Sequence, residues 1–354
     1  MSINGLLAAT GQCQDVSARL PAESYDDDGA MDSFDNQCRG GMPIQLEASF
    51  SPDDRNEFFI KFGFAVDNGL NTVSPWVLAP WAADLEDDVQ DINGTGRDYL
   101  LAAWYRHRFS LGDDSNLGAT FGILDSTDYL DGNAYANDEY TQFMNEAFVN
   151  SGSYNLPSYD AGAALELAHG PWSINALGMN IGENDDGNNY NFWGVQGGYE
   201  ARTGLGTGNY RLLLVGTSNA FIDPEGTNEE ALLAWGLSFD QELGDVLGAF
   251  LRLTWQQDEA AVDYKALYSG GLNLSGSAWG REPDNIGIGY AYLAGGNLDF
   301  DHTQVVEAYY RLGLNDFLGL TADVQYMKDQ RTEVDPLQED PEGWIFGLRL
   351  TAEF

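Results

Sequence analysis

The sequence predicts an all-β protein: a 16-stranded antiparallel transmembrane β-barrel with short turns at one end and long loops at the other. Three observations support this prediction. Apolar and polar residues alternate through sixteen segments, the connections between these segments alternate in length, and no run of eighteen or more apolar residues exists. A membrane-spanning helix needs such a run, so this chain could cross a bilayer only with strands. The mean hydropathy of -0.32 agrees, because a barrel strand has only one apolar face.

The last eleven residues, 344–354, show the alternation most clearly. Side chains at positions i and i+2 share a face only in an extended strand. One face is apolar and the other is mostly polar, and a tilted strand of about ten residues is long enough to cross a bilayer. The apolar face carries Trp344, Phe346, Leu348, Leu350, Ala352 and Phe354, and the other carries Ile345, Gly347, Arg349, Thr351 and Glu353.

The other segments show the same pattern, with examples such as Phe58, Ile60, Phe62 and Phe64. We expect strands at 3–13, 42–51, 56–65, 98–109, 116–124, 160–168, 171–181, 190–201, 209–217, 229–240, 247–257, 270–279, 285–294, 303–312, 318–327 and 343–354. Sixteen strands make a barrel too wide for side chains to fill, so an aqueous lumen should remain.

The connections alternate between long and short along the whole chain. The short ones include 51–55, 110–114, 169–170 and 313–317, and the long ones are 14–41, 66–97, 125–159, 182–189, 218–228, 258–269, 295–302 and 328–342. A soluble sandwich has no reason to keep this order through eight hairpins. No linker rich in Pro, Gly or Ser divides the chain, so we expect residues 1–354 to form one domain.

The formal net charge of -40 excludes nucleic-acid binding through a basic face. Uniform acidity could indicate disorder, but the 43% of hydrophobic residues argues against it. Adaptation to salt is compatible with a barrel. The loops 14–41 and 328–342 hold much of the acid, but no loop has the spacing of an EF-hand and the three histidines, His107, His169 and His302, lie far apart. We expect no metal and no other cofactor.

Cys13 and Cys38 flank an acidic segment, and we expect them to form a disulfide that closes this loop in an oxidising compartment. Two free thiols are the alternative. Residues 1–4 lead into an apolar stretch without a basic start or a small-residue cleavage site. A barrel must cross the inner membrane, so we interpret the numbering as that of a mature or re-engineered chain; a cytoplasmic protein is the alternative.

Charged residues on the predicted strands lie opposite the apolar face. A charge that faces lipid costs roughly 2–4 kcal/mol at mid-depth, so these side chains should point into the lumen. They either brace the wall by pairing or present hydrogen-bonding groups to a solute. We expect Ala at positions 252 and 311 to shift ion preference toward cations. The cations are Lys61, Arg106, Arg108, Arg211, Arg252, Arg311 and Arg349, and the acids are Glu47, Glu166, Glu307 and Asp323.

Inward aromatic rings accompany these charges. Flat rings beside planar polar groups suit the C–H faces and hydroxyl rims of sugars. The same rings could equally pack beneath a loop that folds into the lumen. The residues concerned are Phe59, Phe192, Phe250 and Tyr309.

Segment 125–159 is the longest connection, and a loop of this length normally has a function. It combines apolar residues with acids and amides and contains no Lys or Arg. We expect it to fold into the lumen as a constriction; an external flap is the alternative. We expect its filter residues to be Asp125, Asp128, Asp131, Asn133, Asp138 and Glu139, and the facing wall to carry Arg106, Arg108, Arg252, Arg311 and Glu166.

Three stretches carry a family resemblance: GILDSTDYLDGNAYANDEYTQFMNEAFVNS (122–151), SGSAWGREPDNIGIGYAY (275–292) and VVEAYYRLGLNDFLGLTADVQYMKD (305–329). With them the chain resembles the OprB-type carbohydrate-selective porins over most of its length. The resemblance implies a sixteen-stranded barrel in a bacterial outer membrane with short periplasmic turns, long extracellular loops, passive sugar uptake and a pore lined by charged and aromatic residues. The final Phe354 also resembles outer-membrane barrels, where a terminal aromatic belongs to the assembly signal.

Several functions remain open at this point. The leading hypothesis is a passive diffusion channel that admits carbohydrates, and the alternative is a general or cation-selective porin, because acidic loops concentrate cations at the mouth. We expect no enzyme, since His107 has no G-x-S-x-G nucleophile motif nearby and the acids cluster in loops. A soluble all-β binding module is the last alternative. The expected partners are small solutes and membrane lipids, with a homotrimer as one possible assembly and no nucleic acid.

Overall fold

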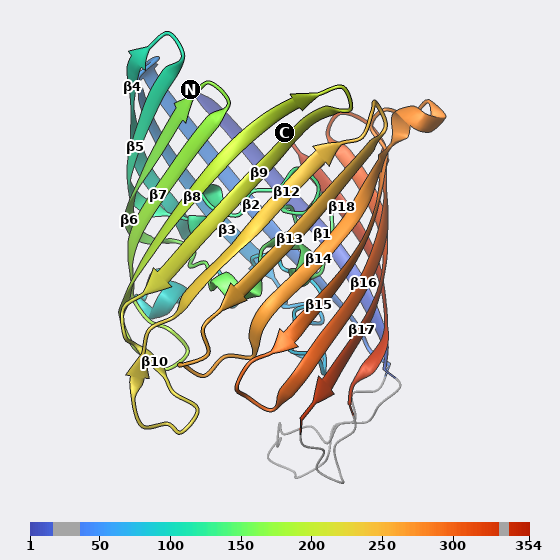
Figure 1. Ribbon diagram of the computed structural model, residues 1–354. Coiled ribbons are helices and arrows are strands. Elements are labelled where there is room, and N and C mark those ends of the chain that lie inside the picture. Colours follow the sequence, from blue (N-terminus) through green and yellow to red (C-terminus); the bar gives the residue numbers. More distant parts are fainter. Residues whose placement is uncertain (17–35, 333–339) are drawn as a thin grey trace.

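The computed structural model describes residues 1–16, 36–332 and 340–354 (Figure 1). Parts of the acidic loops 14–41 and 328–342 lie outside these described residues. Sixteen strands close into one barrel in which every neighbouring pair is antiparallel. The last strand closes the barrel by pairing with the first, Leu6 opposite Glu353 and Val16 opposite Gly343. The predicted fold class is therefore confirmed.

The barrel strands, in chain order, are β1 (Ser2–Val16), β2 (Cys38–Asp53), β3 (Asn56–Val66), β4 (Leu100–Gly112), β5 (Ser115–Leu124), β6 (Asp160–His169), β7 (Trp172–Ile181), β8 (Tyr190–Thr203), β9 (Gly206–Thr217), β12 (Leu233–Glu242), β13 (Leu247–Gln256), β14 (Tyr264–Ser275), β15 (Asn285–Gly295), β16 (Phe300–Gly313), β17 (Leu318–Arg331) and β18 (Glu342–Glu353). A separate hairpin joins β10 (Phe221–Ile222) and β11 (Glu229–Glu230).

Within residues 1–16, 36–332 and 340–354, helical structure is limited to single turns. These are α1 (Glu146–Val149) and the 3-10 turns η1 (Ile92–Gly94), η2 (Ser126–Asp128), η3 (Gly152–Tyr154) and η4 (Gly276–Trp279). In the described part of the chain, no helix has the length and apolarity needed to cross a membrane.

Two predicted strands need correction. The strand expected at 229–240 is β12, Leu233–Glu242, because residues 229 and 230 pair instead with the β10 segment. The strand expected at 270–279 is β14, Tyr264–Ser275. Its register shifts between Tyr264 and Ala266, so that the adjacent Ala266 and Leu267 are both buried. Such a bulge interrupts the two-residue period on which the prediction rested.

The two faces of the wall differ as the alternation predicts. On β18 the outward Trp344, Phe346 and Leu348 are about half exposed, whereas the inward Ile345 is fully buried. A continuous apolar surface is unfavourable in water, so the outer surface is suited to the hydrocarbon of a bilayer.

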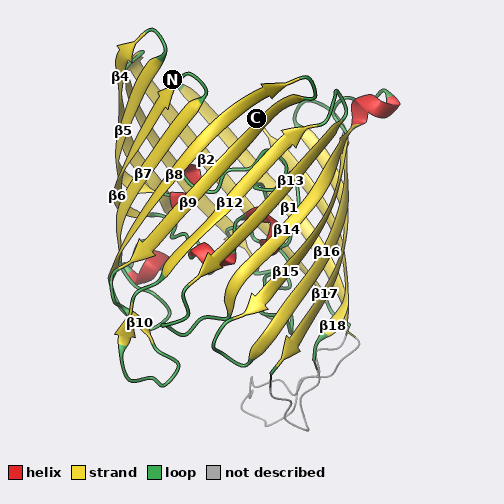
Figure 2. Cartoon of the chain, viewed as in Figure 1, coloured by secondary structure: helices red, strands yellow, loops and turns green. Residues whose placement is uncertain are grey.

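The two chain ends lie at the same end of the barrel, together with the short turns (Figure 1). Figure 2 shows loops and short helical turns lying within the barrel. They come from two connections: the second long loop, residues 67–99 between β3 and β4, and the third long loop, residues 125–159 between β5 and β6. Trp81 and Leu85 of the second loop and Leu130 and Phe148 of the third are almost fully buried. The sequence suggested infolding only for the third loop.

Candidate functional site

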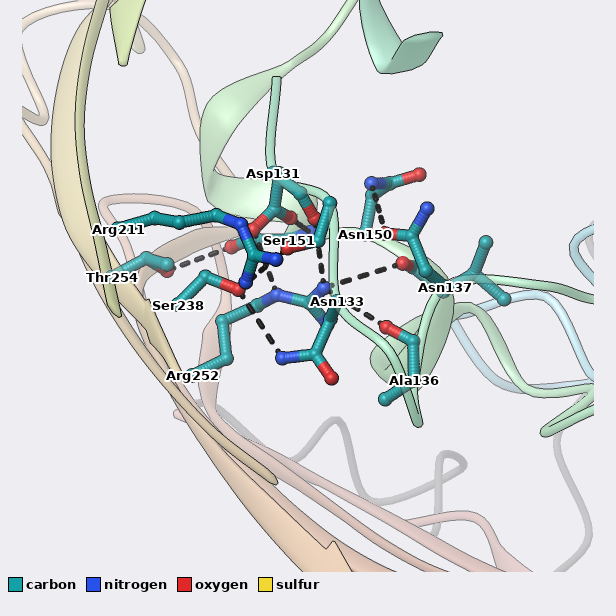
Figure 3. Close-up of polar contacts among 12 residues, drawn as sticks. Asp131, Asn133, Ala136, Asn137, Asn150, Ser151, Arg211, Ser238, Arg252 and Thr254 are labelled. Carbon is teal, nitrogen blue, oxygen red and sulfur yellow. Dashed lines mark hydrogen bonds and ion pairs between the residues drawn. The ribbon is translucent and has the colours of Figure 1, made fainter. Parts of the chain in front are cut away.

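The third loop is long and irregular, so most of its backbone groups need partners outside the loop. The inner wall supplies them. Arg252 of β13 enters this loop, and its guanidinium donates to the carboxylate of Asp131 at 2.9 Å and to the carbonyl oxygens of Asp131, Ala136, Phe148 and Val149 at 3.0–3.4 Å (Figure 3). Its planar fork of five donors suits this task.

Arg252 and Asp131 are both fully buried, so neither presents a charge to a solute. The sequence predicted the inward direction of Arg252 but placed it on the exposed filter wall, and the structure places it inside the packed loop. Asp131 is held further by the Ser151 amide, which donates to its second carboxylate oxygen at 3.0 Å. Asn133 is also buried, where its amide donates to the Ser238 hydroxyl and the Phe239 carbonyl of β12. These residues hold the loop on the wall.

Two further wall residues hold the middle of the third loop. Glu307 of β16 accepts hydrogen bonds from the backbone amides of Met144 and Asn145. Arg349 of β18 donates to the carbonyl oxygens of Glu139 and Gln142. An acceptor and a donor on the wall thus satisfy the amide and carbonyl groups of the loop backbone, which fixes the position of the loop in the lumen.

The second loop packs against the third. The Trp81 indole donates to the Glu139 carbonyl at 3.0 Å, and the Ala79 amide donates to the Glu146 carboxylate at 2.9 Å. The Ala82 amide donates to the Met144 carbonyl at 2.9 Å. The two loops therefore form one continuous plug, and any passage must run between them or beside them.

A cavity of about 660 Å³ lies between the two loops. Seven carboxylates line it, and no Lys, Arg or His does so among the described residues. The seven are Asp84, Asp87, Asp88 and Asp91 of the second loop and Asp125, Glu139 and Glu146 of the third. Ionised carboxylates inside low-dielectric walls focus the field, so a lining of this kind favours cations over anions.

A second cavity, of about 480 Å³, lies on the side of the chain ends and is lined by Gln45, Glu47, Asp138, Tyr140 and others. Consecutive residues of the third loop thus face different cavities, because Glu139 lines the first and Asp138 and Tyr140 line the second. The 138–140 segment separates the two spaces.

Asp84 links the segments that meet at this separation. Its carboxylate accepts from the Gln45 amide and from the Tyr159 hydroxyl, both at 2.7 Å. The Gln45 amide also donates to the Tyr140 hydroxyl at 3.0 Å. Lys61 of β3 lies over the Tyr159 ring, 5.9 Å from its centroid. The network joins the wall, the second loop and the third loop.

Burial changes the acidity of several carboxyls that line the first cavity. It raises the pKa of Asp84, against the opposing effect of Lys61. Burial, together with the nearby acids Asp138 and Asp84, raises the pKa of Glu139 to about 8. Glu139 therefore exchanges its proton close to physiological pH. Burial also raises the pKa of Asp88 to about 7.

Beyond the plug, the wall of β3–β6 presents mixed charges and rings to the lumen. Arg106 pairs with Glu166 at 2.9 Å and lies over the Trp104 ring at 4.9 Å. The Trp104 ring stacks on Phe59 at 4.8 Å. Arg108 pairs with Glu57 at 2.5 Å and is nearly half exposed. The structure thus brings together Arg106, Arg108 and Glu166 of the predicted facing wall.

Replacing Arg106 by Gln tests whether this band faces permeating ions. Loss of the cation leaves Glu166 without its partner, so cation preference should rise about two- to threefold, the effect of one charge at about 7 Å in water. The reversal potential in a KCl gradient measures it. Arg202→Gln is the control, because Arg202 is exposed beside the β8–β9 turn and pairs only with Glu200. Equal reversal potentials for both variants would place Arg106 away from the ion path.

Three predicted site residues remain. Asp125 caps η2 by accepting from the Thr127 amide, and it also lines the first cavity. Asp128 is exposed in the same turn. Arg311 lies near the chain ends, where it pairs with Glu353 at 3.4 Å. Tyr309, two residues away on β16, packs against the third loop, but the ion pair of Arg311 is with β18 and does not join it to that loop.

Of the predicted inward rings, Phe250 and Tyr309 pack against Phe143 of the third loop, with centroids 5.6 and 5.0 Å away. Phe192 packs with Leu130 in another buried cluster. These rings follow the alternative interpretation, packing beneath an infolded loop. Phe59 alone of the four faces the band described above.

Sequence reasoning missed the acids of the second loop and Trp104. The segment 84–91, Asp-Leu-Glu-Asp-Asp-Val-Gln-Asp, lies among apolar residues that now prove to be buried, such as Trp76, Trp81 and Leu85. Apolar anchors mixed with acids were the signal used for the third loop, and the same signal was present here.

Cys13 of β1 and Cys38 of β2 stand opposite each other and form a disulfide. Their position at the start of the first long connection is the one expected from the sequence. The two strands are therefore covalently joined where they leave the barrel.

Comparison with known proteins gives a consistent result. The family model "Carbohydrate-selective porin, OprB family" matches residues 86–354. A protein of Aquifex aeolicus (strain VF5), described as uncharacterized, is 31% identical over 318 residues, which cover 89% of this chain and 84% of that protein. The porin AaxA of Chlamydia pneumoniae is 25% identical over 213 residues, covering 55% of this chain and 47% of that one.

Among solved structures, the high-pH structure of Pseudomonas putida OprB superimposes with a TM-score of 0.71 at 16% identity and covers 99% of this chain and 94% of that one. The outer-membrane channel DcaP of Acinetobacter baumannii gives a TM-score of 0.54 at 8% identity, with 100% and 96% covered. At these identities the structural likeness shows the fold.

Proposed function

Because the chain belongs to the OprB family of carbohydrate-selective porins, and is therefore a diffusion channel of the bacterial outer membrane rather than an enzyme, we propose that it admits small neutral polyhydroxylated solutes such as sugars and excludes anions. The family supports the sugar preference. The charge preference is supported by one observation on this chain, the cavity between the second and third loops with seven carboxylates and no lysine, arginine or histidine among its described lining residues.

A sugar suits this lining chemically. Carboxylate and amide oxygens accept hydrogen bonds from sugar hydroxyls, and the side-chain amides of Asn71 and Asn150, which each donate one hydrogen bond within the protein, have a second N–H to donate. Beyond the plug, Arg106 and Glu166 offer further donors and acceptors beside the Trp104 and Phe59 rings. A neutral solute enters at little cost in electrostatic free energy, whereas an anion is repelled by the carboxylates of both loops.

Liposome swelling tests this proposal with solutes matched in size. Glucose, glucosamine and gluconate differ mainly in charge. We expect glucose and glucosamine to enter at comparable or higher rates and gluconate at least about tenfold more slowly, as expected for steering by a focused field. Equal rates for all three would contradict the charge preference, and failure of every sugar to enter would contradict the sugar assignment.

A general cation-selective porin is the second candidate, and the same seven carboxylates favour it. The two candidates differ in their response to uncharged solutes. A sugar-adapted passage discriminates among sugars of equal mass, because hydroxyl geometry matters in a hydrogen-bonding lining. A general passage sorts them by size alone. Swelling rates for a set of isomeric hexoses and disaccharides decide between the two.

We also propose that residues 1–354 act as one porin domain with lipid around its outer wall, and that barrels associate as homotrimers. The half-exposed outward aromatic and aliphatic residues of strands such as β18 support contact with lipid or with another barrel. The mass of the detergent-solubilised particle, measured by light scattering, tests the assembly. A mass equal to one chain would contradict the trimer.

A further inference from the structure

Large side chains of the third loop rest directly over glycines of the inner wall. A Cβ atom added at any of these glycines would meet the loop side chain at or inside contact distance. The pairs are Gly194 with Leu130, Gly236 with Tyr154, Gly248 with Tyr135, Gly289 with Phe148, and Gly347 with Met144. These five glycines come from five different strands, β8, β12, β13, β15 and β18. We refer to them as the glycine sockets.

The socket at Gly289 shows why the missing side chain matters. A Cβ there would lie 2.7 Å from the Phe148 ring, well inside van der Waals contact. The Phe148 ring cannot turn away easily, because it is fully buried and packs between Phe143 at 4.7 Å and Phe250 at 6.2 Å. The loop backbone would have to move instead.

The direction of that movement follows from the helical turn α1. Phe148 faces the wall, whereas Glu146 and Val149 of the same turn line the first cavity. Pushing α1 away from the wall therefore moves Glu146 and Val149 into the cavity. A filled socket should narrow the passage.

Arg252 acts in the opposite sense, because it draws the loop onto the wall. Its guanidinium donates hydrogen bonds to residues 131, 136, 148 and 149. It therefore holds the loop at Phe148, which rests on Gly289, and at the residue that follows it. A lysine would keep the charge but could not reproduce a planar fork that reaches several acceptors at once.

We propose that the glycine sockets and Arg252 set the depth at which the third loop sits, and that the barrel wall thereby sets the largest solute that passes. Arg252 is a positioning residue in this account. The inference rests on the proposed function as a solute channel and adds that the size limit is determined by residues that no solute touches.

Swelling assays with a graded series of mono-, di- and trisaccharides test the sockets. For Gly289→Ala and Gly194→Ala we expect the disaccharide-to-monosaccharide rate ratio to fall at least about threefold. Gly197→Ala is the matched control, because Gly197 lies on β8 three residues from Gly194, faces outward and has nothing within 4 Å of an added Cβ. The double variant Gly289→Ala with Phe148→Leu removes the clash and should restore the ratio.

Arg252→Lys separates positioning from a role in lining the pore. Positioning predicts a raised trisaccharide-to-monosaccharide ratio and noisier single-channel currents at an unchanged potassium-to-chloride permeability ratio. A pore-lining charge predicts behaviour like the wild type, because lysine retains it. Folded barrels are identified by the heat-dependent shift of their band in SDS electrophoresis. If Gly289→Ala does not fold, the expected fall in the disaccharide-to-monosaccharide rate ratio is tested on Gly194→Ala.

The failures are distinguishable. A wild-type protein that passes no sugar contradicts the proposed function. A wild-type protein that passes sugars, together with socket and Arg252 variants whose size ratios equal that of Gly197→Ala, overturns this inference alone.

Discussion

Replacing three cavity acids together, Asp84→Asn, Asp87→Asn and Glu139→Gln, is expected to abolish most of the cation preference of the channel. All three line the cavity between the second and third loops. The amides are close to isosteric, and each keeps an oxygen that accepts hydrogen bonds, so the contacts of Asp84 with Gln45 and Tyr159 have acceptors left. The potassium-to-chloride permeability ratio should fall on the order of tenfold at low ionic strength.

The salt dependence of this effect is part of the prediction. At 1 M salt the Debye length is only about 3 Å, so the difference between variant and wild type should shrink. Reversal potentials in planar bilayers at pH 9, above the pKa of Glu139, measure both quantities. The matched control is Asp54→Asn, Asp113→Asn and Asp245→Asn, three exposed acids of the short turns. A control that lowers the ratio as much as the cavity variant would contradict the assignment.

The cation preference is also expected to depend on pH in a range where ordinary carboxyls do not titrate. Burial raises the pKa of Glu139 to about 8. A carboxyl with a raised pKa is neutral below that value and charged above it. Glu139 should therefore lose its negative charge as the pH falls from 9.5 to 6.5. Asp88 of the same cavity, whose pKa burial raises to about 7, should lose part of its charge over the same range, and cation preference should fall with both.

The size of the pH effect follows from Coulomb's law. One charge acting over about 7 Å in water contributes about 0.6 kcal/mol, or a change of about threefold in relative permeability. The component with a midpoint near pH 8 should vanish in Glu139→Gln, whereas a component near pH 7 from Asp88 should remain. The neighbouring Asp138, Asp84 and Lys61 remain in that variant, so any pH dependence that they cause should persist there. An unaltered midpoint in Glu139→Gln would assign the titration to another group.

The sequence predicted the wall far better than the contents of the lumen. Alternation is a local property, so strands such as β18 could be placed to within a residue or two. The error at β14 arose where a bulge placed Ala266 and Leu267 both inward, and where η4 continued an apparently alternating pattern beyond Ser275. Irregular backbone of this kind has no signature with a period of two.

The alternation also gave the direction of Arg106, Arg252 and Arg311 but could not separate their roles. All three point inward, yet Arg106 faces the lumen, Arg252 is fully buried in the third loop and Arg311 lies near the chain ends. What covers an inward residue depends on contacts between segments far apart in the sequence, such as Arg252 and Asp131, 121 residues apart. For the same reason, the second loop was not expected in the lumen.

The central claim is that solutes and ions pass through the carboxylate-lined space between the second and third loops. Modification of a single introduced cysteine tests it most directly, because the two native cysteines form a disulfide and neither is free. In Glu139→Cys, a positively charged methanethiosulfonate added during a single-channel recording should cut the conductance for cations in one step, with no effect on Gly197→Cys. A Glu139→Cys channel that reacts with the reagent, as mass spectrometry would show, and conducts as before would contradict the account.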